Sequence, residues 1–242
     1  MEAKKSIKIL AFLTVGAIAI FFLVLFLNTD IESRKGAETS TDLLGLEQNG
    51  QQQSFAAANM PVKSESDFVV GPGGEELDVI VYEDYADIYS AQFAETLERA
   101  RAEFGEKINF VYRPYNVLSS ELSAQAAQAV LCAAENNSKG ADYRSKVFTA
   151  LRAEQLNGDV FSRIAEEVGI EKGAFAACLT NMEKKEKIEG LVAGAANFSV
   201  TGAPTVFVGD EMIVGARPYE AFTDSNGDEI EGLKQVIERQ LK

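Results

Sequence analysis

The sequence predicts an α/β domain that follows a hydrophobic N-terminal segment and a polar connecting stretch. Three observations lead to this fold class. A strand, a helix and a second strand succeed one another over residues 77–112, helical segments fill the middle of the chain, and a β-hairpin and a helix complete it. A strand–helix–strand unit with a crossover of this length places its two strands in parallel.

Length, charge and composition restrict the class of protein. The chain has 242 residues, 46% of them hydrophobic, which suits one folded domain with appended segments. Its net charge is −14, whereas a nucleic-acid binder needs a basic surface, so we expect no nucleic-acid partner. The absence of histidine excludes Ser–His and Cys–His catalysis and imidazole metal ligands. We expect no metal site and no cofactor.

Residues 1–28 are predicted to be a cytoplasmic tip and a transmembrane signal anchor. The run 9–27 carries no charge and approaches the roughly 20 residues that a helix needs to cross a bilayer. Three lysines precede it, so the positive-inside rule places the following domain outside the cytoplasm, in the periplasm or at the cell surface. A cleaved signal peptide is the alternative, because residues 17–19 have a small-x-small pattern inside the run.

Residues 29–66 are predicted to be a flexible tether, because residues 47–54 are polar and lack periodicity. The folded domain then covers residues 67–242. A short strand is expected at 68–70 and a buried, β-branched strand at 77–82. A helix begins near Asp87 and ends at Gly105, with its apolar residues on one face, and a strand follows at 108–112.

A helical insert is expected over residues 119–198. Its predicted helices are 120–135, 143–156, 160–168, 172–179 and 184–198. Asp159 is the expected N-cap of the third helix. Strands at 205–208 and 211–214 then form a hairpin around Gly209 and Asp210, and a last helix covers 229–241.

This plan of elements and five short motifs are similar to one known family. The motifs are residues 69–72 (VVGP), 79–85 (VIVYEDY), 110–113 (FVYR), 202–205 (GAPT) and 214–219 (VGARPY). In this order they resemble the DsbA-type thiol–disulfide oxidoreductases. The resemblance covers residues 67–242 and implies a thioredoxin fold with a helical insertion.

The resemblance fails at the residues that carry the family's chemistry. A Cys-x-x-Cys pair opens the first long helix in the family, and the corresponding residues here are Asp87, Ile88, Tyr89 and Ser90. A thiolate at a helix start attacks a disulfide sulfur, and the second cysteine resolves the mixed disulfide. Neither a carboxylate nor a hydroxyl can replace sulfur in this exchange. We therefore expect no catalytic residue here, and Asp87 is interpreted as a helix N-cap rather than a catalytic group.

The resemblance also implies a peptide-binding loop at Ala203, Pro204 and Thr205. In the family this proline follows a cis peptide bond and faces the active-site pair. A proline at the start of a strand is common in itself, but the motif favours the cis bond here. An extended peptide can pair with the backbone of the residue before the proline, here Ala203, and this pairing needs no sulfur.

The two cysteines, Cys132 and Cys178, lie in the insert and match no active-site motif. Outside the cytoplasm an even number of cysteines usually indicates a disulfide. Two free buried thiols are the alternative, and a redox-active pair is a third reading.

Three functions remain open from the sequence. The first is a non-redox, chaperone-like protein of the cell envelope that binds extended protein or peptide segments and is held in the membrane by its N-terminal helix. The second is a thiol–disulfide oxidoreductase or isomerase that uses Cys132 and Cys178 or a partner's cysteines. The third is a structural subunit of an envelope complex. The first is preferred, because no cysteine stands at a helix start.

Overall fold

A computed structural model of the chain describes residues 54–56, 59–72, 74, 77–116, 120–135 and 139–242. Gln51–Lys242 form one compact unit. The expected signal anchor, residues 1–28, and most of the expected tether lie outside the described residues. In the part of the chain that is described, no helix combines the length and the hydropathy that crossing a membrane requires.

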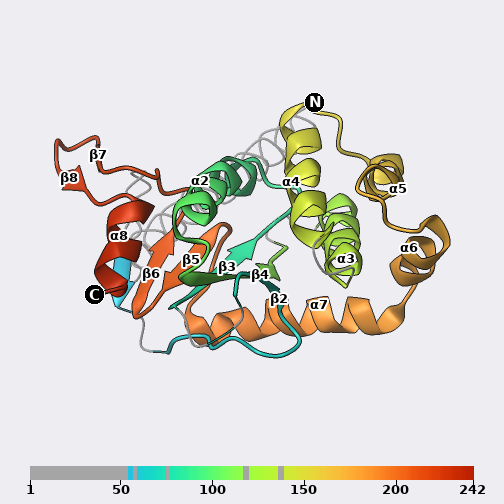
Figure 1. The fold of residues 1–242 in the computed structure, drawn as a ribbon, viewed down its shortest axis with the longest axis horizontal. Helices are drawn as coiled ribbons and strands as arrows, with labels where there is room; N and C mark the ends of the chain where they lie inside the picture. Colours follow the sequence, from blue (N-terminus) through green and yellow to red (C-terminus); the bar gives the residue numbers. More distant parts are fainter. Residues whose placement is uncertain (1–53, 57–58, 73, 75–76, 117–119, 136–138) are drawn as a thin grey trace, which may run out of the picture. The chain divides into compact units, whose positions relative to one another are not determined.

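A mixed sheet lies at the centre of the domain (Figure 1), with its strands in the order β1-β6-β5-β3-β4-β2. In that order the strands are Ser54–Ala56, Glu211–Val214, Thr205–Val208, Leu77–Glu83, Ile108–Pro114 and Phe68–Val70. β3 and β4 are parallel, as the strand–helix–strand pattern predicted, and the other neighbours are antiparallel. A separate small hairpin joins β7 (Phe222–Thr223) to β8 (Glu229–Ile230).

The side chains on the two faces of the sheet belong to two different hydrophobic clusters. In β3, Val79 and Val81 belong to the larger cluster, while Ile80 and Tyr82 belong to the smaller one on the opposite face. This alternation follows from the two-residue period of a strand. Because all four side chains are buried, β3 is a central strand covered on both faces, as its apolar sequence predicted.

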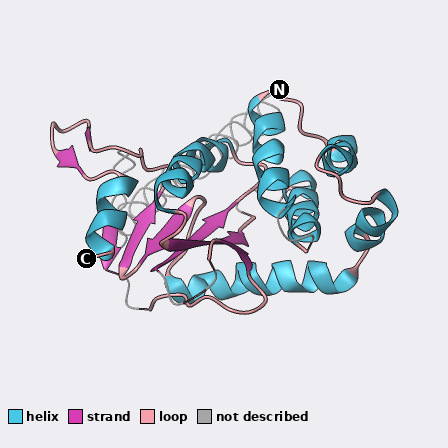
Figure 2. Cartoon of the chain, viewed as in Figure 1, coloured by secondary structure: helices cyan, strands magenta, loops and turns pink. Residues whose placement is uncertain are grey.

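Helices α2 (Ile88–Phe104) and α8 (Leu233–Gln240) pack against the larger cluster. Figure 2 shows both helices beside the sheet. The apolar face predicted for α2 is buried, and Gly105 is the residue that caps its C-terminal end. α2 therefore crosses over between the parallel strands β3 and β4, and its N-terminus lies at the carboxyl end of β3.

The insert between β4 and β5 is helical, as predicted. It consists of α3 (Glu121–Ala134), α4 (Lys139–Arg152), α5 (Gly158–Glu167), α6 (Lys172–Leu179), α7 (Met182–Ala195) and the 3-10 helix η1 (Ala196–Phe198). Its aromatic side chains Phe148, Phe161 and Phe175 belong to the same cluster as β3 and α2. The insert therefore shares one core with the sheet and helps to position the residues at the start of α2.

Several predicted boundaries were wrong for local reasons. The N-cap of α5 is Asn157, whose side chain accepts a hydrogen bond from the Asp159 backbone N–H, so Asp159 lies in the first turn. α4 ends at Arg152, shortly before Glu154, whose φ is 57°. The last helix begins at Leu233 rather than at Glu229, because Glu229 pairs with β7 in the small hairpin.

The chain before residue 67 also contacts the domain, although the sequence placed it in the tether. β1 pairs with the β6 edge in antiparallel register, with Phe55 opposite Met212. Farther along, the Asp67 carboxylate pairs with the Arg113 guanidinium at 2.8 Å. Burial raises the pKa of Asp67. The hydrogen bonds from Arg113 and Ser64 and the Arg113 charge together lower it by more, so the net pKa lies below its ordinary value.

Candidate functional site

The start of α2 contains the four residues that correspond to the family's Cys-x-x-Cys motif. Asp87 is the N-cap, and its carboxylate accepts a hydrogen bond from the Ser90 backbone N–H at 2.7 Å. The Ser90 side chain is turned inward, the residue being 1% exposed, and its hydroxyl oxygen accepts from the Asp84 N–H at 3.2 Å. The interpretation of Asp87 as a helix cap is therefore confirmed. Ser90 cannot reach a substrate in this position.

A second set of hydrogen bonds fixes the turn that precedes α2. The Asp84 carboxylate is buried and accepts from the Ala86 backbone N–H at 2.9 Å. The same oxygen accepts from the hydroxyl of Ser123, in the first turn of α3. The turn at the candidate site is therefore attached directly to the insert.

A buried ion pair, which the sequence did not predict, joins the end of β3 to α4. Glu83, the last residue of β3, accepts two hydrogen bonds of 2.6 Å from Arg144 of α4, and both side chains are 1% exposed. The guanidinium lies 4.0 Å from the ring centroid of Tyr112. Burial lowers the pKa of Arg144, but the Glu83 carboxylate and the neighbouring Tyr112 and Tyr85 together raise it by more, so the net pKa is above its ordinary value. Arg144 therefore stays charged and holds the end of β3 to the insert.

Two apolar side chains are exposed beside the capped turn. Ile88 is 44% exposed and Tyr89 is 60% exposed, and both rank among the few large hydrophobic residues of the described chain that face solvent. They occupy the middle two positions of the motif, while the outer two bind the backbone. The start of α2 thus presents two exposed apolar side chains and no thiol.

The cis-proline loop adjoins this surface. The Ala203–Pro204 peptide bond is cis, so the prediction is confirmed. The register pairs Thr205 with Tyr82, which places Pro204 beside the end of β3 and the turn into α2. The Thr205 hydroxyl donates to the Gly202 carbonyl at 2.7 Å, and the Gly215 N–H donates to the Pro204 carbonyl at 2.8 Å. These bonds hold the loop from both sides.

The backbone of Ala203 is left without a partner in this arrangement. Among the described residues, its N–H and C=O groups take part in no hydrogen bond. A backbone donor and acceptor next to each other in a partly buried loop can pair with an added extended segment. The loop therefore has the cis bond that the resemblance implied.

The cysteines are joined in a disulfide between α3 and α6, as predicted. The Cα atoms of Cys132 and Cys178 are 5.8 Å apart, within the usual range for a disulfide. The amide of Gln128, one turn before Cys132, donates to the Leu179 carbonyl at 2.7 Å and reinforces the same junction. The pair lies in the last turns of its helices, where the negative end of the helix dipole disfavours a thiolate.

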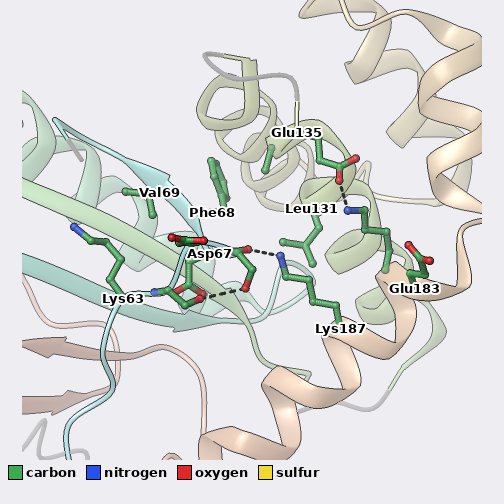
Figure 3. A pocket seen from close by; sticks show the side chains of 13 residues that line it. Lys63, Asp67, Phe68, Val69, Leu131, Glu135, Glu183 and Lys187 are labelled. Atoms are coloured by element: carbon green, nitrogen blue, oxygen red, sulfur yellow. Dashed lines mark hydrogen bonds and ion pairs between the residues drawn. The ribbon is translucent and has the colours of Figure 1, made fainter. Parts of the chain in front are cut away.

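A hollow of about 920 Å³ lies between the segment that precedes β2, the end of α3 and the start of α7 (Figure 3). Its cationic side chains already have partners. Lys184 pairs with Glu135, Lys187 donates to the Ser66 carbonyl, and Lys63 pairs with Asp78. Burial and then the neighbouring Lys184 charge lower the pKa of Lys187. All three lysines that line the hollow are therefore already engaged with neighbouring groups.

The fold and the site together define a thioredoxin-fold domain with a helical insertion, a cis-proline loop and no thiol at the helix start. Residues 78–225 match the family model described as a DSBA-like thioredoxin domain. The chain belongs to this family.

Curated relatives show where else such a segment occurs. The chain is 26% identical over 166 residues to a protein of Nitrosospira multiformis named Na(+)/H(+) antiporter NhaA, covering 68% of this chain and 26% of that one. It is 30% identical over 100 residues to the uncharacterized protein YwbO of Bacillus subtilis, covering 40% of this chain and 50% of that one. The chain thus spans about a quarter to a half of the length of these relatives.

Solved structures show the same fold at low identity. A thioredoxin-like oxidoreductase from Silicibacter pomeroyi has a TM-score of 0.58 at 22% identity, over 73% of this chain and 92% of that one. A periplasmic thioredoxin-like protein from Salmonella enterica serovar Typhimurium also has a TM-score of 0.58, at 19% identity, over 73% and 90% of the two chains. Wolbachia pipientis alpha-DsbA1 has a TM-score of 0.56 at 16% identity, over 74% and 93%.

Proposed function

We propose that this protein holds extended segments of other proteins at its cis-proline loop, as a chaperone-like or assembly factor, without thiol–disulfide chemistry. One observation carries the proposal. Among the described residues the Ala203 backbone has no hydrogen-bond partner, and Ile88 and Tyr89 are exposed at the start of α2. The positions of the family's cysteines hold Asp87, which caps the helix, and Ser90, whose hydroxyl accepts from a backbone N–H. These features support binding without redox chemistry.

The proposal includes a location outside the cytoplasm, with the chain held in the membrane by residues 1–28. The uncharged run and the lysines before it support this topology. The Cys132–Cys178 disulfide also favours an oxidising compartment. Proteins named Na(+)/H(+) antiporter NhaA contain a similar segment, and ion transport between compartments supports the membrane part of this proposal.

The oxidoreductase alternative has less support. Cys132 is 2% exposed, its sulfur is bonded to Cys178, and neither cysteine stands at the start of a helix. A reactive thiolate needs access and a stabilising positive environment. The structural-subunit alternative requires no groove, so a binding experiment separates it from the proposal.

The test is the binding of a permanently unfolded protein to the full-length chain in lipid nanodiscs. Fluorescent α-lactalbumin, reduced and blocked with iodoacetamide, is expected to bind and to raise the anisotropy. The double substitution Ile88→Glu with Tyr89→Glu should weaken binding by about tenfold, because it removes two apolar contacts from the edge of the groove.

Met182→Glu is the matched control, since Met182 is 62% exposed at the start of α7, and it should bind like the unmodified protein. Equal binding by the double variant, or no binding by the unmodified protein, would contradict the proposal. The second result would favour the structural-subunit alternative.

A further inference from the structure

A smaller apolar pocket of about 390 Å³ lies between the start of α3 and the second half of α7. It is lined by Asn116, Ser120, Ala124, Ile188, Glu189, Val192 and Ala193. Most of these side chains are apolar, with an amide and a hydroxyl on one wall. This composition is typical of sites that accept an apolar group and orient it with a few polar contacts.

The pocket is connected to the cis-proline loop through Tyr115. The Tyr115 backbone N–H donates to the Glu83 carbonyl at 2.8 Å, immediately before the turn into α2. Its hydroxyl donates to the Val200 carbonyl at 3.4 Å, in the segment that leads to Pro204. Asn116, which lines the pocket, follows Tyr115 in the chain. Tyr115 therefore links the pocket to the end of β3 and to the segment that precedes Pro204.

The stretch of chain that connects the pocket to the loop is uncharged. No charged residue occurs from Gly190 through Gly209, in a chain of which 25% of the residues are charged. Gly190 and Ala193 are exposed on α7, and a Cβ atom added at Gly190 would contact nothing within 4 Å. An extended segment that follows this stretch from the loop to the pocket would therefore desolvate no charge of the stretch itself, because the stretch has none.

One charge stands at the pocket itself. Glu189 is exposed, and within the described part of the chain it takes part in no ion pair. No lysine or arginine is among the described residues that line the pocket. A segment that enters here therefore meets an apolar cavity and a single unneutralised carboxylate, which complements a cationic residue next to an apolar one.

We propose that the segment held at the cis-proline loop inserts an apolar side chain of about leucine size into this pocket, and that a lysine or arginine beside it pairs with Glu189. This inference rests on the proposed function and states which segments the groove selects. The preferred client carries an apolar residue flanked by basic residues.

The experiment measures peptide binding to the full-length chain in nanodiscs by anisotropy. The probes are three fluorescent ten-residue peptides of glycine and serine. One has a central leucine between two lysines, one has alanine in place of the leucine, and one has glutamates in place of the lysines. The leucine–lysine peptide should bind about tenfold more tightly than the alanine peptide and also more tightly than the glutamate peptide.

Substitutions that fill the pocket should remove this preference. Ala124→Phe and Ala193→Phe each place a ring in the cavity from an exposed helical position, so the leucine and alanine peptides should then bind alike. Ala102→Phe, at an exposed position of α2, is the matched control. Glu189→Lys should weaken the leucine–lysine peptide by about threefold, whereas Glu238→Lys, an equal charge change on α8, should not.

The outcomes separate this inference from the proposed function. The pocket inference is overturned if the three peptides bind equally and Ala124→Phe has no effect. If the double substitution Ile88→Glu with Tyr89→Glu still weakens binding in that case, the proposed function is nevertheless supported. If no peptide binds and unfolded α-lactalbumin does not bind either, both are overturned. If Ala124→Phe and Ala193→Phe lose the preference for the leucine peptide and the control Ala102→Phe keeps it, the pocket inference is supported.

Discussion

The start of α2 and the junction of α3 with α6 each have one of the two features of a redox site, which are a helix start and a pair of cysteines. At the start of α2, where the family places a reactive cysteine pair, a carboxylate and a hydroxyl bind the backbone. At the helical junction two sulfurs are present, but they are bonded to each other. One region keeps the geometry of a redox site without sulfur, and the other keeps sulfur without the geometry.

The difference shows that the two requirements are physically separable. A helix start needs an acceptor for its free N–H groups, and Asp87 supplies it as well as any residue type. A disulfide needs two cysteines at the right separation and orientation, which the packing of α3 against α6 provides. Neither feature depends on the cis-proline loop, which persists beside the first.

The largest effect is expected from placing sulfur in the geometry that lacks it. Asp87→Cys with Ser90→Cys, made in full-length protein that also carries Cys132→Ala and Cys178→Ala, should gain catalysis of insulin reduction by dithiothreitol. The helix start stabilises the thiolate at residue 87, and residue 90 supplies the resolving sulfur. The unmodified protein should show no rate above background in the same turbidity assay.

The control is Asp87→Cys with Ser90→Ala in the same background, which should form mixed disulfides without turnover. A well-folded double-cysteine variant with no activity would show that the groove no longer presents substrate to the helix start. Turnover by the unmodified protein that disappears in Cys132→Ala would instead support the oxidoreductase alternative.

The next effect tests the region that has sulfur without redox geometry. Replacing both Cys132 and Cys178 by alanine should lower the free energy of unfolding by about 4 kcal/mol in the chain-entropy account, because the bond spans a sequence separation of 46. Urea unfolding with and without reductant measures this loss. The double variant should not respond to reductant. Two thiols that react in the unfolded, unreduced protein would contradict the bond.

The smallest effect is expected at the capped turn. Asp87→Ala removes the acceptor for the Ser90 N–H and should cost about 1 kcal/mol in urea unfolding, whereas Asp87→Asn should keep most of that stability. Binding of unfolded α-lactalbumin should stay within about twofold of the unmodified protein, since the carboxylate serves the backbone. A tenfold loss of binding in a stable Asp87→Ala variant would assign the carboxylate a direct role.

The sequence predicted the sheet and the insert because their signals are local. Residues 77–82 form a β-branched run bounded by turn residues, and the apolar spacing along α2 needs no tertiary information. The cis bond at Pro204 followed from the resemblance, and the disulfide followed from the expected compartment. These predictions use the period of a single element, a short motif or the expected compartment.

What escaped prediction depends on packing between distant segments. The Glu83–Arg144 pair joins residues 61 positions apart, and an arginine in an amphipathic helix is normally expected to face water. Ser54–Ala56 is a strand only because the β6 edge pairs with it. The pocket beside Glu189 exists only once α3 and α7 are in place.

The pairing of β1 with β6 has a mechanical consequence. Any pull on the chain before Ser54 reaches the sheet first through three residue pairs at its edge, which can open one after another without disturbing the core. Further attachments along the chain are the Val62 carbonyl, which accepts from Arg113 at 2.7 Å, and the Lys63–Asp78 ion pair. Release of residues 54–61 would add roughly 25 Å of extended chain. The domain could thus reach farther under load while its groove stays folded.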